Sequence, residues 1–137
     1  MARHLPEASM AVRIVRLGSP RLPGEGTRLG TVRRPPRGVR KEDFSTRDYY
    51  DAWLPTLAPQ PETLKLALHG TGPRDWATFV RRYRAEMAGG EGRHVLDALA
   101  ALSHTADFSV GCYCEDESRC HRSILRELLA ERGASIA

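Results

Sequence analysis

Three segments of the chain have the pattern of short strands. Near the start, Val12, Ile14 and Val15 alternate in part with arginines. Residues 107–113 form a second apolar segment, and residues 28–33 a shorter extended piece. A period of two is typical of strands, because successive side chains point to opposite faces. We therefore predict strands at both ends of the chain and a third between them.

Four segments carry apolar residues at the three- and four-residue spacing of amphipathic helices. The predicted helices cover residues 61–69, 73–88, 91–103 and 118–132. Ser118 is the expected N-cap of the last helix, and Gly133 its stop. This order predicts an α/β fold: a small single-domain sandwich with a largely parallel sheet flanked by helices. We expect residues 10–137 to form the domain and residues 1–9 a flexible N-terminal extension.

Composition narrows the class of protein. The chain is 41% hydrophobic and 28% charged, which fits a globular protein and excludes a disordered one. No apolar run approaches the roughly 20 residues of a membrane span. The first residues lack the apolar core of a signal peptide. We expect a cytoplasmic protein with no membrane partner and no cofactor.

Positive charge is concentrated in the first third of the chain. Residues 1–47 hold ten arginines and one lysine against four acidic residues, a balance that can attract nucleic acid or other polyanions. Residues 33–41 place five of these cations on a segment that two adjacent prolines keep out of a helix. Two interpretations stay open: an arm that grips phosphate or carboxylate groups, and a solvated surface loop.

An aromatic group follows the basic loop. Tyr49, Tyr50 and Trp53 lie close together in the sequence, near two leucines. Such a group is more often core or a docking surface than a platform for stacking bases. We assign it to the core.

All three cysteines lie within nine positions, where a predicted strand leads into the last predicted helix. Cys112 and Cys114 lie at the end of the strand, and the first turn of the helix contains Cys120, His121 and Arg122. An odd number of cysteines without an export signal indicates reduced thiols, not a disulfide scaffold. In α/β proteins such connections commonly bind ligands.

Three functional hypotheses follow. In the first, the start of the helix and Arg122 bind an anionic, phosphate-bearing ligand such as a nucleotide or nucleic acid, with Cys112 or Cys120 as a candidate nucleophile. Acidic residues 115–117 would oppose this if they faced the site. In the second, the thiols form a redox or metal-responsive centre. In the third, the arginine-rich loop serves a non-catalytic nucleic-acid-binding module.

A zinc site is less favoured by the spacing. Zinc ligands normally come in pairs two to four residues apart. Cys120 and His121, if adjacent on a helix, would point about 100° apart. We predict no metal ligand.

Four sequence blocks carry a resemblance to a known family. They are Arg33-x-x-Pro36-Arg37-Gly38-Val39-Arg40-Lys41-Glu42, Trp53 with Ala58-Pro59, Trp76-x-x-Phe79-x-x-x-Tyr83-x-x-Glu86, and Cys112 with Cys120-His121-Arg122 and Leu125. Over roughly residues 12–132 the chain resembles the domain of unknown function 488 family, which includes the YeaO-like uncharacterised bacterial proteins. In the last block, seven residues separate the two cysteines, and this block is the most specific to the family.

The resemblance implies a compact α/β fold and a set of site residues, without an established activity. The candidate catalytic residues are Cys112, Cys120 and His121, and the candidate ligand-binding residues are Arg33, Arg37 and Arg122. The chain also departs from the family pattern. Cys114 stands where many relatives have an acid, and residues 32–35 replace an Asp-Arg-Leu-Trp run. Whether the protein is an enzyme stays open at this point.

Overall fold

The structure, a computed structural model, describes residues 10–137, so the predicted extension over residues 1–9 lies outside the described part. The strands are β1 (Val12–Arg16), β2 (Thr27–Gly30), β3 (Ala52–Trp53) and β4 (Phe108–Cys112). The α-helices are α1 (Pro61–His69), α2 (Gly72–Ala88), α3 (Gly90–Leu102) and α4 (His121–Glu131). Three short 3-10 helices are η1 (Lys41–Asp43), η2 (Pro55–Leu57) and η3 (Glu117–Arg119).

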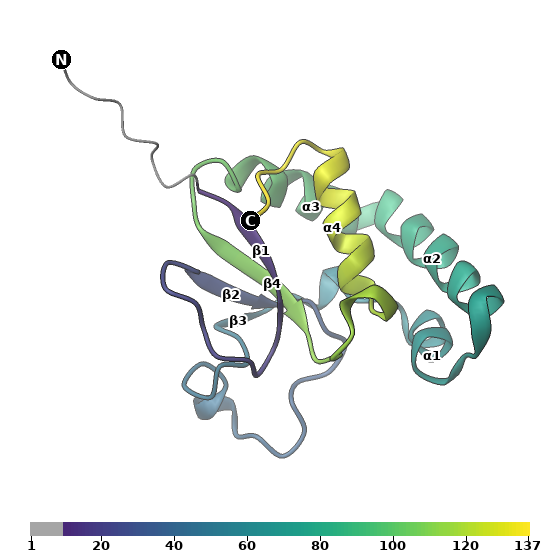
Figure 1. The fold of residues 1–137 in the computed structure, drawn as a ribbon, viewed down its shortest axis with the longest axis horizontal. Helices are drawn as coiled ribbons and strands as arrows, with labels where there is room; N and C mark the ends of the chain where they lie inside the picture. Colours follow the sequence, from purple (N-terminus) through teal and green to yellow (C-terminus); the bar gives the residue numbers. More distant parts are fainter. Residues whose placement is uncertain (1–9) are drawn as a thin grey trace.

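The four strands form one parallel sheet in the order β1-β4-β2-β3 (Figure 1). β4 lies between β1 and β2, and all five of its residues are buried. Because the strands are parallel, their carboxyl ends meet at one edge of the sheet. The predicted α/β fold with a largely parallel sheet is confirmed.

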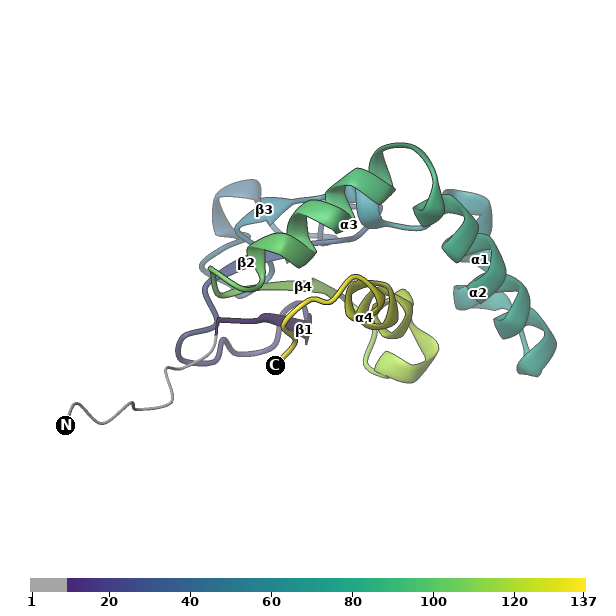
Figure 2. The same ribbon diagram turned by 90° about the horizontal axis from the view of Figure 1, so that it is seen from above.

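The helices pack on one face of the sheet. Val12, Leu29 and Val110 lie on this face and contact the main apolar core, to which all four α-helices contribute. Seen from above, α3 and α4 lie beside the strands and α1 and α2 stand farther out (Figure 2). The burial of these apolar side chains drives the assembly of the layers.

Loops cover the other face, where a buried ion pair replaces apolar packing. The Arg28 side chain is fully buried, and its Nε donates to Glu25 Oε2 at 2.7 Å. Arg28 Nη1 also donates to the backbone oxygens of Ser19 and Asp48, at 2.8 and 2.6 Å. Ser109 of β4 donates its hydroxyl to Glu25. One arginine therefore ties two loops to the underside of the sheet.

The predicted elements agree with the structure except at the start of the last helix, at β3, and at the strand predicted over residues 28–33, which ends at Gly30. The helices expected over residues 61–69, 73–88 and 91–103 match α1, α2 and α3 to within a residue at each end. The last helix, expected from residue 118, begins at His121, and its N-cap is Cys120, so the prediction of Ser118 as N-cap was wrong. The two-residue strand β3 was not predicted. Within residues 10–137 no helix is both long and apolar enough to cross a membrane.

Candidate thiol and imidazole site

The site lies where β4 ends and α4 begins, at the carboxyl edge of the sheet. Cys112 is the last residue of β4 and is 2% exposed. The residue before it, Gly111, has no room for a side chain, because a Cβ there would stand 2.5 Å from the backbone oxygen of Val15. This close approach of β1 to β4 fixes the position of Cys112.

A short turn brings Cys120 back to Cys112. Asp116 is the N-cap of η3, and its carboxylate accepts hydrogen bonds from the backbone N–H and the hydroxyl of Ser118. The N–H of Cys120 donates to Glu117, and Cys120 itself has extended backbone angles, with φ −131° and ψ 152°. Cys120 therefore precedes α4 and is not part of its first turn.

The sulfur atoms of Cys112 and Cys120 are in direct contact inside the protein. Cys120 is 1% exposed, so neither thiol faces solvent. The two Cα atoms are 8.0 Å apart, whereas disulfides usually span about 4.4–6.8 Å between Cα atoms. The backbone holds the two residues wider than a disulfide requires. Cys114 is a free thiol outside this contact, and burial raises its pKa.

His121, the first residue of α4, completes the cluster. Its Nε2 lies 2.7 Å from the backbone oxygen of Thr31. A carbonyl oxygen can only accept a hydrogen bond, so Nε2 carries the proton and Nδ1 keeps its lone pair. Nδ1 lies 3.8 Å from the Sγ of Cys120. Burial lowers the pKa of His121 to about 4, and the imidazole is therefore neutral at pH 7.

Three potential ligand atoms thus gather in one place. The sulfurs of Cys112 and Cys120 and a ring nitrogen of His121 all lie within 4.8 Å of one another, and all three residues are buried. The expectation that Cys120 and His121 diverge assumed that both lie on a helix. Since Cys120 has extended backbone angles, that geometric objection to a shared ligand does not apply.

A small cavity of about 190 Å³ opens beside the cluster. Cys112 and His121 form part of its wall. The rest is mostly apolar, and includes Val32, Leu64 and Leu68. Leu68 of α1 is 58% exposed, so the cavity lies next to the surface. A small molecule with an apolar part could approach the sulfur of Cys112 from this side.

Arg122 follows His121 in the first turn of α4. It is 4% exposed, and its Nη2 donates to the backbone oxygen of Cys114. Its Nε is buried without a hydrogen-bond partner among residues 10–137. Burial lowers the pKa of Arg122, although Glu117 acts in the opposite direction. A buried guanidinium with a free donor can bind an acceptor or an anion.

The acidic residues of the connecting loop do not face the thiols. Glu115 has a side chain 84% exposed and lies 3.4 Å from Arg16. Glu117 binds Arg126 through both carboxylate oxygens, at 2.7 and 2.9 Å, and Asp116 caps η3. Their negative charge is directed to solvent or to other cations. The main electrostatic objection to an anion near Cys120 is therefore weak.

The two candidate arginines of the basic loop lie in different surroundings. Arg33 lies beside Cys112 and His121 in the wall of the cavity. Its guanidinium donates to the backbone oxygens of Pro59 and Ala58, both at 3.1 Å. Arg37 is exposed and lines a separate depression with Arg16 and Tyr49. The structure thus brings Arg33, but not Arg37, to the thiol cluster.

Two further residues support the cluster and were not among the candidate site residues. Thr31 acts through its backbone oxygen, which no side-chain pattern can reveal. Tyr83 packs edge-on against the His121 ring, with 5.6 Å between ring centres, and donates its hydroxyl to Leu57 at 2.6 Å. Its position in the apolar stripe of α2 indicated only a core residue.

Comparison with known proteins gives one match. A family described as the active DUF488-N3 subclade matches residues 12–133, nearly the whole chain. Searches of curated proteins and of solved structures found no match to this chain.

Proposed function

The chain belongs to the active DUF488-N3 subclade of the DUF488 family, and we propose that it binds one transition-metal ion through Cys112, Cys120 and His121. Two thiolates and an imidazole are the donor set that zinc prefers. The observation that carries the proposal is the convergence of these three buried ligand atoms within 4.8 Å. The protein is then a metal-dependent member of its family.

The state of His121 supports metal binding. A metal ligand must be a neutral imidazole with a free lone pair, and Nδ1 has one because Nε2 donates to Thr31. Histidines that bind metals usually donate their second ring N–H to a carboxylate, a backbone carbonyl or water, which fixes the tautomer and the ring. Thr31 provides this support here.

The backbone spacing of the cysteines also suits an ion between them. Two thiolates on one tetrahedral zinc stand about 3.8 Å apart, given Zn–S bonds of about 2.3 Å. The sulfurs must separate to reach this distance, and Cα atoms 8.0 Å apart allow it without bringing the backbones closer. A disulfide would instead need the backbones to approach.

Three protein ligands beside a cavity favour a catalytic ion over a structural one. Structural zinc sites are closed by four protein ligands, whereas catalytic sites keep the fourth position for water or substrate. Cys112 and His121 line the cavity of about 190 Å³, so a fourth ligand would enter from there. The bound ion would act as a Lewis acid on a small substrate whose apolar part contacts Val32 and Leu64.

The test is metal analysis of protein purified without chelator, followed by Co²⁺ substitution. We expect about one ion per chain, and thiolate-to-cobalt charge-transfer absorption, in the wild type. Cys112→Ser and Cys120→Ser should lose both signals, while Cys114→Ser, the matched control, keeps them. Protein free of metal with every thiol titratable would contradict the proposal. An isolated Cys112–Cys120 disulfide without metal would instead support the thiol-redox hypothesis.

The buried guanidinium of Arg122 favours a second candidate function. In this case the loop binds an anionic, phosphate-bearing ligand, such as a nucleotide or nucleic acid, with Cys112 or Cys120 as nucleophile. The Nε of Arg122 has no partner within residues 10–137, and residues 115–117 direct their charge elsewhere. Phosphate should then slow alkylation of the wild-type thiols in the presence of EDTA, and should not do so in Arg122→Met. Equal protection in both proteins would exclude this role.

A further inference from the structure

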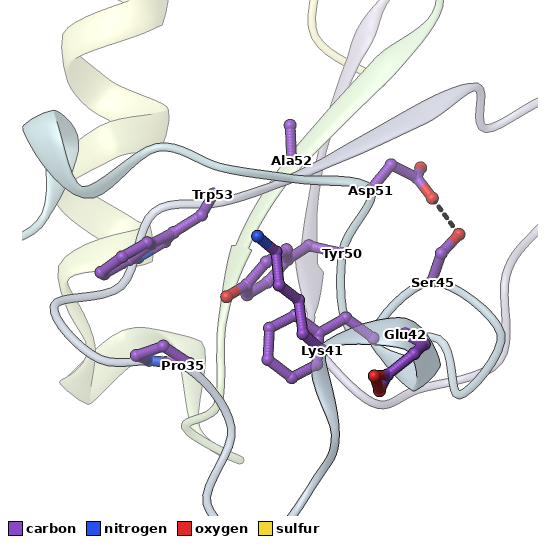
Figure 3. Close-up of a pocket in the computed structure, with 9 residues that line it drawn as sticks. Pro35, Lys41, Glu42, Ser45, Tyr50, Asp51, Ala52 and Trp53 are labelled. Atoms are coloured by element: carbon purple, nitrogen blue, oxygen red, sulfur yellow. Dashed lines mark hydrogen bonds between the residues drawn. The ribbon is translucent and has the colours of Figure 1, made fainter.

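A second cavity, of about 450 Å³, lies on the loop-covered side of β3 and is lined by none of the three metal ligands (Figure 3). It is formed where the basic loop, η1 and β3 meet. Pro35 and Lys41 come from the loop and η1, and Tyr50 and Trp53 from the segment that enters β3. The end of the basic loop and the aromatic segment before β3 therefore line the same pocket.

The floor of this pocket contains a polar group that the protein leaves unbonded. Tyr50 is 4% exposed and lines the pocket, and its hydroxyl has no hydrogen-bond partner among residues 10–137. Figure 3 shows this hydroxyl between Lys41, Pro35 and Trp53. Burying a hydroxyl without a partner costs about 1–3 kcal/mol, so the position calls for a ligand that supplies an acceptor.

One wall is an exposed indole that is held in place. Trp53 is 44% exposed, and its Nε1 donates to the backbone oxygen of Val32 at 2.7 Å. A large aromatic side chain fixed at the surface of an edge strand offers a flat face to a planar group. Our assignment of Trp53 to the core was thus wrong, whereas Tyr50 is buried as expected.

The charge at the pocket is suited to an anion. The side chain of Lys41 extends over the pocket beside the Tyr50 ring (Figure 3). No ion pair with a carboxylate is found for its ammonium group in the described part of the chain. Asp51 on the rim is already bound by Arg21, at 2.9 Å, and by Ser45. Glu42 also lines the pocket, and its carboxylate lies 3.9 Å from the Nε of Arg40. The charge at the pocket that has no ion-pair partner within residues 10–137 is that of Lys41.

We propose that this pocket binds a nucleobase-bearing anion, with the base stacked on Trp53, an acceptor of the base bonded to the Tyr50 hydroxyl, and a phosphate beside Lys41. A bare phosphate would leave the aromatic wall unused, and an uncharged apolar ligand would leave the hydroxyl unpaired. The lining of the pocket includes none of the three metal ligands, although Tyr50 belongs to the same buried cluster as Cys112 and Cys120, and the proposal goes beyond the proposed function. Its loss should leave metal binding intact.

Calorimetric titration is the primary test, with Trp53 fluorescence in a Trp76→Phe background as a second readout. The probes are AMP, CMP, adenosine, inorganic phosphate and a single-stranded DNA pentamer. We expect AMP or CMP to bind saturably and to quench Trp53, adenosine to bind at least tenfold more weakly, and phosphate alone not to compete. Tighter binding of the pentamer than of the mononucleotides would assign the site to a strand, and weaker binding to a free nucleotide.

Two variants separate ligand recognition from stability. Tyr50→Phe should weaken binding about five- to tenfold without lowering Tm, because the lost hydroxyl bonds nothing in the protein. Lys41→Met should weaken it about tenfold, while the control Lys65→Met, an exposed lysine on α1, leaves it unchanged. No saturable binding of any probe by wild type at millimolar concentration overturns the proposal. Unchanged affinity in both pocket variants, or full competition by inorganic phosphate, also overturns it.

Discussion

The imidazole of His121 donates through Nε2 to the backbone oxygen of Thr31, at 2.7 Å. This contact links the first residue of the last helix to the residue that follows β2, 90 positions earlier in the chain. It orients the ring so that Nδ1 faces the sulfur of Cys120. The backbone oxygen of the residue after β2 thus sets the tautomer of His121 and the direction of its free lone pair.

Replacing His121 with Phe should show the cost of losing this contact. Phe keeps the volume that packs on Tyr83 but leaves the buried Thr31 oxygen without its donor. We expect the free energy of unfolding in EDTA to fall by about 1–3 kcal/mol, and metal binding to be lost. Urea denaturation and cobalt absorption measure the two effects.

His104 provides the matched control for this substitution. Its Nε2 makes the same kind of bond, to Gly133 at 2.8 Å, but at the surface. His104→Phe should change stability by less than about 1 kcal/mol, because water can replace the donor. Equal losses for both variants would show that burial of the Thr31 oxygen is not what matters.

The buried pair of Arg28 and Glu25 predicts an asymmetric mutational response. Arg28→Met leaves the Glu25 carboxylate buried without its cation and should cost about 3–5 kcal/mol. The double variant Arg28→Met with Glu25→Leu removes both charges and should be more stable than the single one. Chemical denaturation of the three proteins tests this, and a double variant no more stable than Arg28→Met would count against it.

The same pair contributes to acid sensitivity. Burial alone would raise the pKa of Glu25, but hydrogen bonds from Arg28, the Leu22 N–H and Ser109 outweigh it and lower the pKa. A lowered folded-state pKa gives stability that is present above the unfolded value of about 4.3 and is lost as pH falls through the folded value. The free energy of unfolding should therefore decline below about pH 4.

Asp51 should act in the same direction at still lower pH. Burial raises the pKa of its carboxyl, but hydrogen bonds from Arg21, the Arg28 N–H and Ser45 lower it to about 2. Its stabilising contribution is complete above about pH 4 and disappears near pH 2. Asp51→Asn should cost about 1 kcal/mol at pH 7, after allowance for solvent screening, and almost nothing at pH 2. Urea titrations at both pH values measure the difference, and an equal loss at both would contradict this assignment.

Arg33 was predicted to bind a ligand, and its contacts predict a structural contribution as well. Its two hydrogen bonds within residues 10–137 both go to backbone oxygens, of Pro59 and Ala58. Arg33→Lys keeps the charge but cannot make the two bonds from one planar group. We expect a loss of about 1–2 kcal/mol in stability, whereas Arg37→Lys, at an exposed position, should be neutral. Thermal unfolding of the two variants measures the structural contribution of Arg33.

The sequence predicted the elements that have strong periodicity. The stripe through Phe79 and Tyr83 defined α2, and the alternation around Val12 defined β1, because their burial pattern repeats locally. Ser118 failed as an N-cap because a nearer acceptor, Asp116, binds its N–H and forms a 3-10 turn. A local preference for Ser could not show which of two capping arrangements the loop would adopt.

The convergence of site residues could be predicted only in part. Cys112, Cys120 and His121 were chosen from a motif, and the strand-to-helix connection explains why they meet. The direction of the His121 ring depends on Thr31, which follows β2 and acts through its backbone. Trp53 was assigned to the core from the burial tendency of aromatic residues. Because β3 was not predicted, its place at the sheet edge was not foreseen.

Gly30 connects the sheet to the second pocket and gives the last prediction. A Cβ at this residue would lie 2.3 Å from the ring of Tyr50. The glycine is therefore required by close packing between β2 and the Tyr50 ring. Gly30→Ala must displace that ring and should cost about 1–3 kcal/mol of stability.

Gly38→Ala is a poor control, because its φ of 75° strains any other residue. Gly89, with open space around its Cβ position and an extended φ of −121°, is the better one. If Gly30→Ala is as stable as Gly89→Ala, Tyr50 does not pack as described. If it is less stable and also loses nucleotide binding, while metal content stays unchanged, the pocket depends on the position of the Tyr50 ring and the thiol site does not.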